Sequence, residues 1–78
     1  MREKRCMLVI SFRTTTAAMA METLCQKEGI DGRIIPLPRE ISADCGLAWR
    51  AEISQRGELE ALMRRENIEA AGIYEMMV

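Results

Sequence analysis

The sequence lacks histidine, the side chain most often used for acid–base catalysis near neutral pH. Aromatic residues are scarce, with one Trp, one Tyr and one Phe among 78 residues, so base-stacking surfaces for nucleic acids are missing. The 11 Lys and Arg residues do not exceed the 12 Asp and Glu residues. We therefore expect no general nucleic-acid-binding surface and no histidine-based catalytic site.

Long apolar runs are also absent. No segment approaches the roughly 20 apolar residues of a membrane span. The run Cys6–Ile10 follows a charged start, but it is shorter than the roughly 7–15 apolar residues of a signal peptide. The three cysteines, Cys6, Cys25 and Cys45, are odd in number and widely spaced, which argues against a disulfide framework. The sequence therefore predicts a cytoplasmic protein with reduced thiols, no membrane association and no metal site.

Hydrophobic periodicity predicts the order β-α-β-β-α-β within a single domain, residues 1–78. A threonine among residues 14–16 should cap the first helix, Gly29 should end it, and Ser54 should cap the second helix. The most economical arrangement is a ferredoxin-like α+β sandwich, in which both helices cover one face of a four-stranded antiparallel sheet of order 4-1-3-2. A two-layer α/β variant with another strand order is the alternative. The expected strands are 6–12, 32–36, 47–53 and 72–78, and the expected helices are 17–28 and 55–66.

The longest irregular segment runs from Leu37 to Gly46 and ends in the pair Cys45-Gly46. Long ordered loops in small domains often carry function. In the expected topology, this loop lies at the same end of the molecule as residues 14–16, where the first helix begins. The turn near Asn67, between the second helix and the last strand, belongs to that end too.

A helix N-terminus has free N–H groups and a partial positive charge, and Arg13 and Arg39 are close in sequence. Such surroundings favour the thiolate form of a partly exposed cysteine. Gly46 would give access to the sulfur and allow an unusual backbone angle. These features predict that Cys45 is a reactive thiol, although an incidental loop cysteine remains the alternative. Cys6 and Cys25 lie on apolar faces of the first strand and first helix, so we expect both to be buried.

Four stretches of the chain together form a distinctive pattern: Ser11–Ala18, Ile35–Ser42, Asp44–Ala48 and Gly72–Tyr74. On these residues the chain resembles a family of small bacterial proteins described as selenium/sulfur carrier-like, formerly a domain of unknown function. The resemblance covers nearly the whole chain and is most specific in the combination I-P-x-P-R-x-I-S-x-x-C-G.

The resemblance implies a cytoplasmic protein that holds sulfur or selenium on Cys45 as a persulfide or selenosulfide. Donor and acceptor proteins would be its partners, and no cofactor would be needed. Arg39 and the helix N-terminus would stabilise the sulfur anion. Thr14, Thr15 and Ser42 could donate hydrogen bonds to it, although Thr15 could equally be a plain helix cap and Ser42 a turn residue that bonds its own backbone.

Two other classes of function stay open, whereas a true enzyme is disfavoured because no acid–base pair or phosphate-binding glycine loop is evident. The first class is a binding module in which Arg39 and Cys45 line a small anion pocket. The second is an interaction protein, because the sheet face away from the helices would be apolar, and such patches mark interfaces. A homodimer through this open face, or a partner enzyme that covers it, is therefore expected. The face would carry Met7, Val9, Ala48, Ile34 or Ile35, and Tyr74 or Met76.

Overall fold

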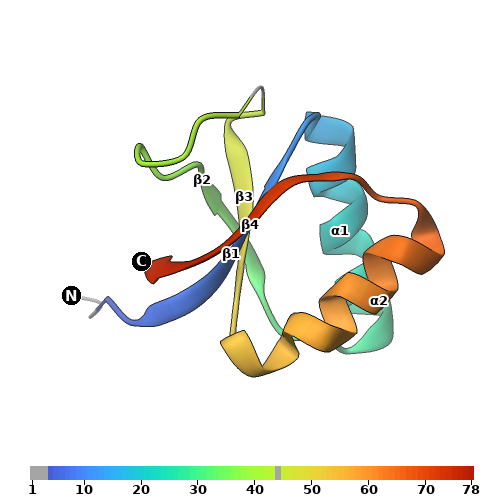
Figure 1. Ribbon diagram of the computed structural model, residues 1–78. Helices are drawn as coiled ribbons and strands as arrows, with labels where there is room; N and C mark the ends of the chain where they lie inside the picture. The colour runs from blue at the N-terminus through green and yellow to red at the C-terminus, as the bar shows by residue number, and fades with distance from the viewer. Residues whose placement is uncertain (1–3, 44) are drawn as a thin grey trace.

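The central strand β1 (Cys6–Phe12) pairs with strands on both of its sides in the computed structural model, which describes residues 4–43 and 45–78. Figure 1 shows both helices on one face of the twisted sheet. This arrangement confirms the α+β prediction. The elements follow in the order β1, α1 (Thr15–Glu28), β2 (Arg33–Pro36), β3 (Leu47–Ala51), a short 3₁₀ helix η1 (Ile53–Gln55), α2 (Arg56–Glu66) and β4 (Ala70–Met77).

The sheet has the neighbour order β2-β3-β1-β4, which is 4-1-3-2 when counted from the β4 edge. All three pairings are antiparallel, with Ile10 opposite both Trp49 and Ile73. A register shift between Ser11 and Phe12 marks an irregularity in the β1–β4 ladder. The order sets β1 and β3 side by side at the centre, so the end of β1 adjoins the start of β3.

The main core lies between the sheet and the helices. Alternate residues of β1 and β3 point into it, because successive side chains of a strand face opposite ways. Each fully buried large apolar side chain stabilises the fold by roughly 1.5–3 kcal/mol. The most deeply buried members are Leu8, Ile10, Phe12, Trp49, Met21, Cys25, Leu59 and Leu62.

The segment between β2 and β3 covers part of the opposite face of the sheet, which was expected to be open. The Leu37 N–H donates to the Gly46 carbonyl at 2.9 Å and closes this loop at its base. Ile41 then packs on Val9 and Ala48, which are fully buried. The loop supplies part of the expected apolar cover, whereas Tyr74 on the same face is exposed, and the homodimer stays a prediction.

Local signals at the helix ends explain most boundaries. The Thr14 hydroxyl accepts a hydrogen bond from the Ala17 N–H at 3.1 Å, and Gly29 ends α1 in the left-handed conformation, with φ of 70°. Ser54 does not cap α2, which is a wrong prediction: it lies inside η1, and α2 begins after Gln55 without a side-chain cap. The 3₁₀ turn continues directly into the helix, so no separate cap is formed. Strand β3 consequently ends at Ala51, two residues before the predicted end.

Candidate functional site

Cys45 lies just before β3, beside the N-terminus of α1. Its Sγ accepts a hydrogen bond from the Leu47 N–H at 3.4 Å, and the Thr15 Oγ1 lies 3.7 Å away, with either atom able to donate. Thr15 is the first residue of α1, which follows the Thr14 cap. The sequence prediction that the loop cysteine meets this helix start is therefore confirmed by the Thr15 contact.

The electrostatic setting of the sulfur comes from two backbone sources. The first turn of a helix presents N–H groups and about half a positive charge, and the Leu47 N–H points at Sγ directly. Hydrogen bonds to an anion are roughly twice as strong as those between neutral groups. The sulfur therefore lies beside a backbone donor and the start of α1.

The exposure of Cys45 differs from the prediction. We expected a partly exposed thiol, but its residue surface is only 3% accessible. The side chain turns toward the helices and joins the main core with Phe12 and Trp49. Attack by this sulfur on another molecule therefore requires a local movement of the loop or of the start of α1.

The other predicted site residues are distributed around the site. Arg39 and Ser42 are exposed and flank Ile41, which packs on the sheet face opposite the helices, and no hydrogen bond joins either to Cys45 in the part of the chain described. Figure 1 shows this segment extending away from α1. Arg13 is exposed and pairs with Glu69 at 3.8 Å. The Thr14 hydroxyl serves the helix cap, so it is not directed at the sulfur.

Gly46 does not adopt the unusual backbone angle that the sequence suggested. Among the described residues, the glycines with positive φ are Gly29 and Gly32. A Cβ added at Gly46 would meet no atom within 4 Å. The backbone at Gly46 thus borders open space, but Cys45 itself is buried, so the role of this glycine in access to the sulfur stays a prediction.

The remaining cysteines differ from each other. Cys25 is fully buried as predicted, and burial, with a smaller effect of the nearby Glu28 carboxylate, raises the pKa of its thiol to about 11. Cys6 was expected in the core but is exposed. It is the first residue of β1 and pairs with the exposed Met77 near the end of β4, beyond the cover of the helices. Core packing therefore accounts for Cys25 alone.

A surface cavity of about 390 Å³ adjoins the start of α1. The segment between α2 and β4 forms its other wall, which confirms that this turn shares one end of the molecule with the first helix start. Charges of both signs surround it, from Arg13, Glu66 and Glu69. The lining is completed by Thr14, Thr16, Ala17, Ala20, Asn67 and Ile68.

Sequence reasoning missed the contact from the Leu47 N–H. The sequence carries a weak signal of this contact: a glycine follows the cysteine, and a strand starts two residues after the cysteine. In Asx and Ser turns, too, a side chain forms a hydrogen bond with the nearby backbone. It also missed that Ile41 would hold the loop against the sheet, although an isolated apolar residue in a polar loop was a usable sign.

Fold and site together define a small α+β domain with one cysteine held at a helix start. The family model described as "Putative Se/S carrier protein-like" matches residues 7–75, and the chain belongs to this family. No curated protein and no solved structure matches the chain, so the ferredoxin-like assignment stays a prediction. Within the described residues, the helices are too short or too polar to cross a membrane.

Proposed function

We propose that this protein carries sulfur or selenium on Cys45, as a persulfide or selenosulfide, and passes the atom to an acceptor protein. The observation that supports this most is the hydrogen bond from the Leu47 N–H to Sγ beside the start of α1. Membership of the family supports the cargo. Among the described residues, no backbone N–H donates to the Sγ of Cys6, which is exposed, or to that of Cys25, which is buried.

The transfer step needs only two sulfur centres. The Cys45 thiolate attacks the terminal sulfur of a donor persulfide, forms a new S–S bond and breaks the donor's S–S bond, and the donor cysteine leaves as a thiolate. The second step repeats this exchange with an acceptor thiolate and regenerates Cys45. A terminal selenium atom would be exchanged in the same way. No net oxidant, metal or second cysteine of this chain takes part.

The burial of Cys45 determines how a partner must engage. The loop that carries it is held by the Leu37–Gly46 backbone bond and by Ile41 on the sheet. A loop held by so few contacts can open locally at a free-energy cost well below that of global unfolding. A donor that binds over Gly46 and the start of α1 would expose the sulfur while it docks. This requirement would keep water away from the loaded atom until another molecule docks over the loop.

The low exposure of Cys45 also favours a second candidate, a binding module in which this thiol only fills space. The two candidates differ in the effect of Cys45→Ser. Serine keeps a side-chain acceptor for the Leu47 N–H, so the fold and any binding to a partner are retained.

The test uses a cysteine desulfurase charged with ³⁵S-labelled persulfide and a small-thiol acceptor. The carrier proposal expects label on the wild type and on Cys6→Ser, label passed on to the acceptor, and none on Cys45→Ser. Binding of Cys45→Ser to the desulfurase at wild-type affinity shows that the variant is competent to dock. Equal labelling of the wild type and Cys45→Ser would overturn the carrier proposal.

A further inference from the structure

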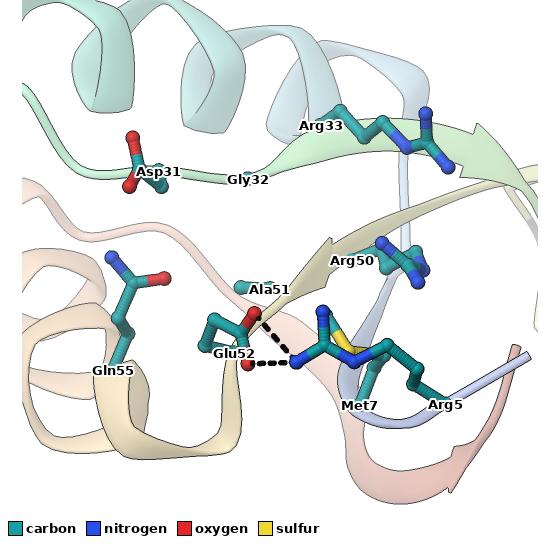
Figure 2. Close-up of a pocket in the computed structure, with 9 residues that line it drawn as sticks. All are labelled: Arg5, Met7, Asp31, Gly32, Arg33, Arg50, Ala51, Glu52 and Gln55. Atoms are coloured by element: carbon teal, nitrogen blue, oxygen red, sulfur yellow. Dashed lines mark hydrogen bonds and ion pairs between the residues drawn. The ribbon is translucent and has the colours of Figure 1, made fainter.

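A second cavity lies at the opposite end of β1 and β3 from Cys45, and arginine side chains surround it. Its volume is about 390 Å³. Figure 2 shows the guanidinium groups of Arg5, Arg33 and Arg50 gathered on one side of it. The remaining lining residues are Met7, Asp31, Gly32, Ala51, Glu52 and Gln55.

Two of these arginines lie side by side on neighbouring strands. Arg33 on β2 is the direct partner of Arg50 on β3, so both side chains project from the same face. Like charges directly opposite each other on a sheet are destabilising. In a chain with net charge −1, such a pair is not explained by a general excess of arginine.

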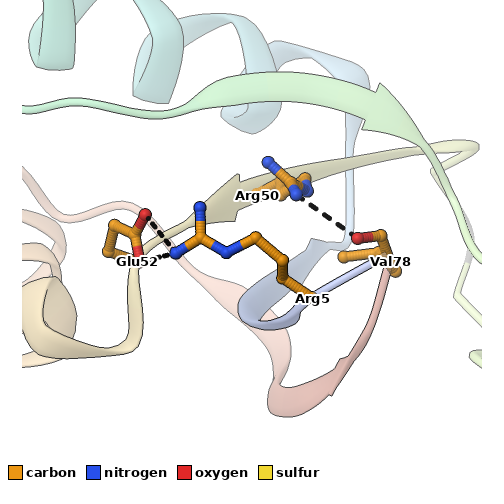
Figure 3. Close-up of polar contacts among 4 residues, drawn as sticks. All are labelled: Arg5, Arg50, Glu52 and Val78. Carbon is orange, nitrogen blue, oxygen red and sulfur yellow. Dashed lines mark hydrogen bonds and ion pairs between the residues drawn. The ribbon is translucent and has the colours of Figure 1, made fainter. Parts of the chain in front are cut away.

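The carboxylates of the cavity do not neutralise this pair. Glu52 is occupied by Arg5, whose guanidinium donates to both carboxylate oxygens at 3.1 and 3.2 Å (Figure 3). Asp31 lies beside Gln55 at the far end of the cavity from the two arginines (Figure 2). Arg50 donates to the Val78 backbone oxygen at 3.3 Å, and Arg33 has no ion pair within residues 4–43 and 45–78.

We propose that this cavity binds the phosphate group of a small phosphorylated molecule between Arg33 and Arg50. A guanidinium presents its donors as a planar fork that suits phosphate oxygens, and two such forks balance the charge of a phosphate dianion. The cavity is in the size range of small-molecule sites and larger than one phosphate, and the buried Met7 offers an apolar surface for the organic part.

This site is separate from the proposed carrier site. The cavity lies beside the start of β1 and the end of β3, whereas Cys45 adjoins the end of β1 and the start of β3. Cys45→Ser should therefore keep phosphate binding, and Arg33→Gln should keep sulfur loading. Failure of one proposal leaves the other unaffected.

The test measures thermal unfolding of the full chain with inorganic phosphate or ribose 5-phosphate, against chloride at matched ionic strength. A ligand at tenfold excess over its Kd should raise the Tm by roughly 5–10 °C for a domain of this size. Arg33→Gln and Arg50→Gln should lose this rise. Arg64→Gln is the matched control, because Arg64 is an exposed arginine of α2 that does not line the cavity.

Arg33→Gln is the more decisive of the two variants, because Arg50→Gln also removes the hydrogen bond from Arg50 to Val78. Arg33→Gln should in addition melt at a higher temperature than the wild type in chloride, since the repulsion is gone. An equal Tm rise with phosphate in the wild type and Arg33→Gln would overturn the proposal. A rise with a Glu-rich peptide but with neither phosphate compound would also overturn it and would reassign the cavity to an acidic protein partner.

Discussion

The Leu47 N–H donates to the Sγ of Cys45, two residues earlier in the chain, across 3.4 Å. This is the pattern of an Asx or Ser turn, in which a side chain accepts from the backbone two residues on. The bond turns the thiol inward at the start of β3 and brings it within 3.7 Å of the Thr15 hydroxyl. This backbone contact thus forms part of the polar surroundings of the sulfur.

The three thiols should react with iodoacetamide in a fixed order. Cys6 is exposed and should be alkylated first, Cys45 should follow after local opening, and Cys25 should stay protected until the chain unfolds globally. Peptide mass spectrometry at timed intervals gives the three rates. The Ile41→Ala variant loses the loop's anchor on Val9 and Ala48. Its alkylation rate at Cys45 should therefore rise, whereas the rate at Cys25 should change much less. Simultaneous labelling of Cys45 and Cys25 would contradict local opening.

Cys25 should make the fold less stable at alkaline pH. Its pKa is raised from 9.0 to about 11 in the folded chain, so the unfolded chain loses this proton first as the pH rises. Between about pH 9 and 11 the folded state binds more protons, and the free energy of unfolding falls with pH. Two pKa units correspond to about 2–3 kcal/mol, a contribution that is present below about pH 9 and lost by about pH 11.

Urea unfolding of the wild type and Cys25→Ala from about pH 7 to 11 isolates this effect from other alkaline titrations. The variant should be less stable near neutral pH, because a buried side chain is shortened. The difference between the two proteins should shrink as the pH approaches the raised pKa of the folded chain. A constant difference over this range would show that Cys25 does not couple folding to protons.

Two adjacent threonines should separate helix stability from sulfur chemistry. Thr14→Ala removes the α1 cap and should cost about 1 kcal/mol, with sulfur loading unchanged well below the Tm. Thr15→Val should change stability by less than about 0.5 kcal/mol, since Thr15 is exposed, and slow the loading of Cys45 by about 3- to 10-fold. Denaturant melts and ³⁵S loading rates measure the two effects. Equal loading rates for Thr15→Val and the wild type would show that the Thr15 hydroxyl does not assist loading.

A pair of glycine substitutions should separate access from folding. Gly46→Ala places its Cβ in open space and should alter stability by less than about 1 kcal/mol, while any loss of loading reports on the approach of the donor. Gly32→Ala should cost about 2–4 kcal/mol, because φ is 147° there and the Cβ would lie 2.5 Å from the Trp49 Nε1. Thermal unfolding of both variants is the measurement. Strong destabilisation by Gly46→Ala would show that this position is structural.

Local signals in the sequence were sufficient for most of the fold. The apolar run of β1 and the glycine after Glu28 indicate element type and end, because they depend only on neighbouring residues. The contact between Thr15 and Cys45 also followed, since strand direction decides which ends meet.

Long-range packing accounts for what the sequence did not reveal. Whether Ile41 folds back on Val9, or points to solvent, depends on the path of a ten-residue loop rather than on local pattern. The same path carries Arg39 away from Cys45. The Arg33–Arg50 pairing depends on the register between β2 and β3. The length and path of that loop determine this register, whereas the alternation within each strand does not. Cys6 lies on the same face of β1 as Leu8, but the helices do not extend far enough to cover it.

Intact-mass spectrometry of a chain that retains only Cys45, with Cys6→Ser and Cys25→Ser, shows whether Cys45 carries sulfur or selenium. After incubation with a persulfide-loaded desulfurase, we expect an added mass of roughly 32 Da, or roughly 79 Da with a selenium donor. The adduct should vanish with dithiothreitol and never form when Cys45→Ser is added. An unmodified mass after incubation, with the desulfurase shown to be loaded, would contradict the account.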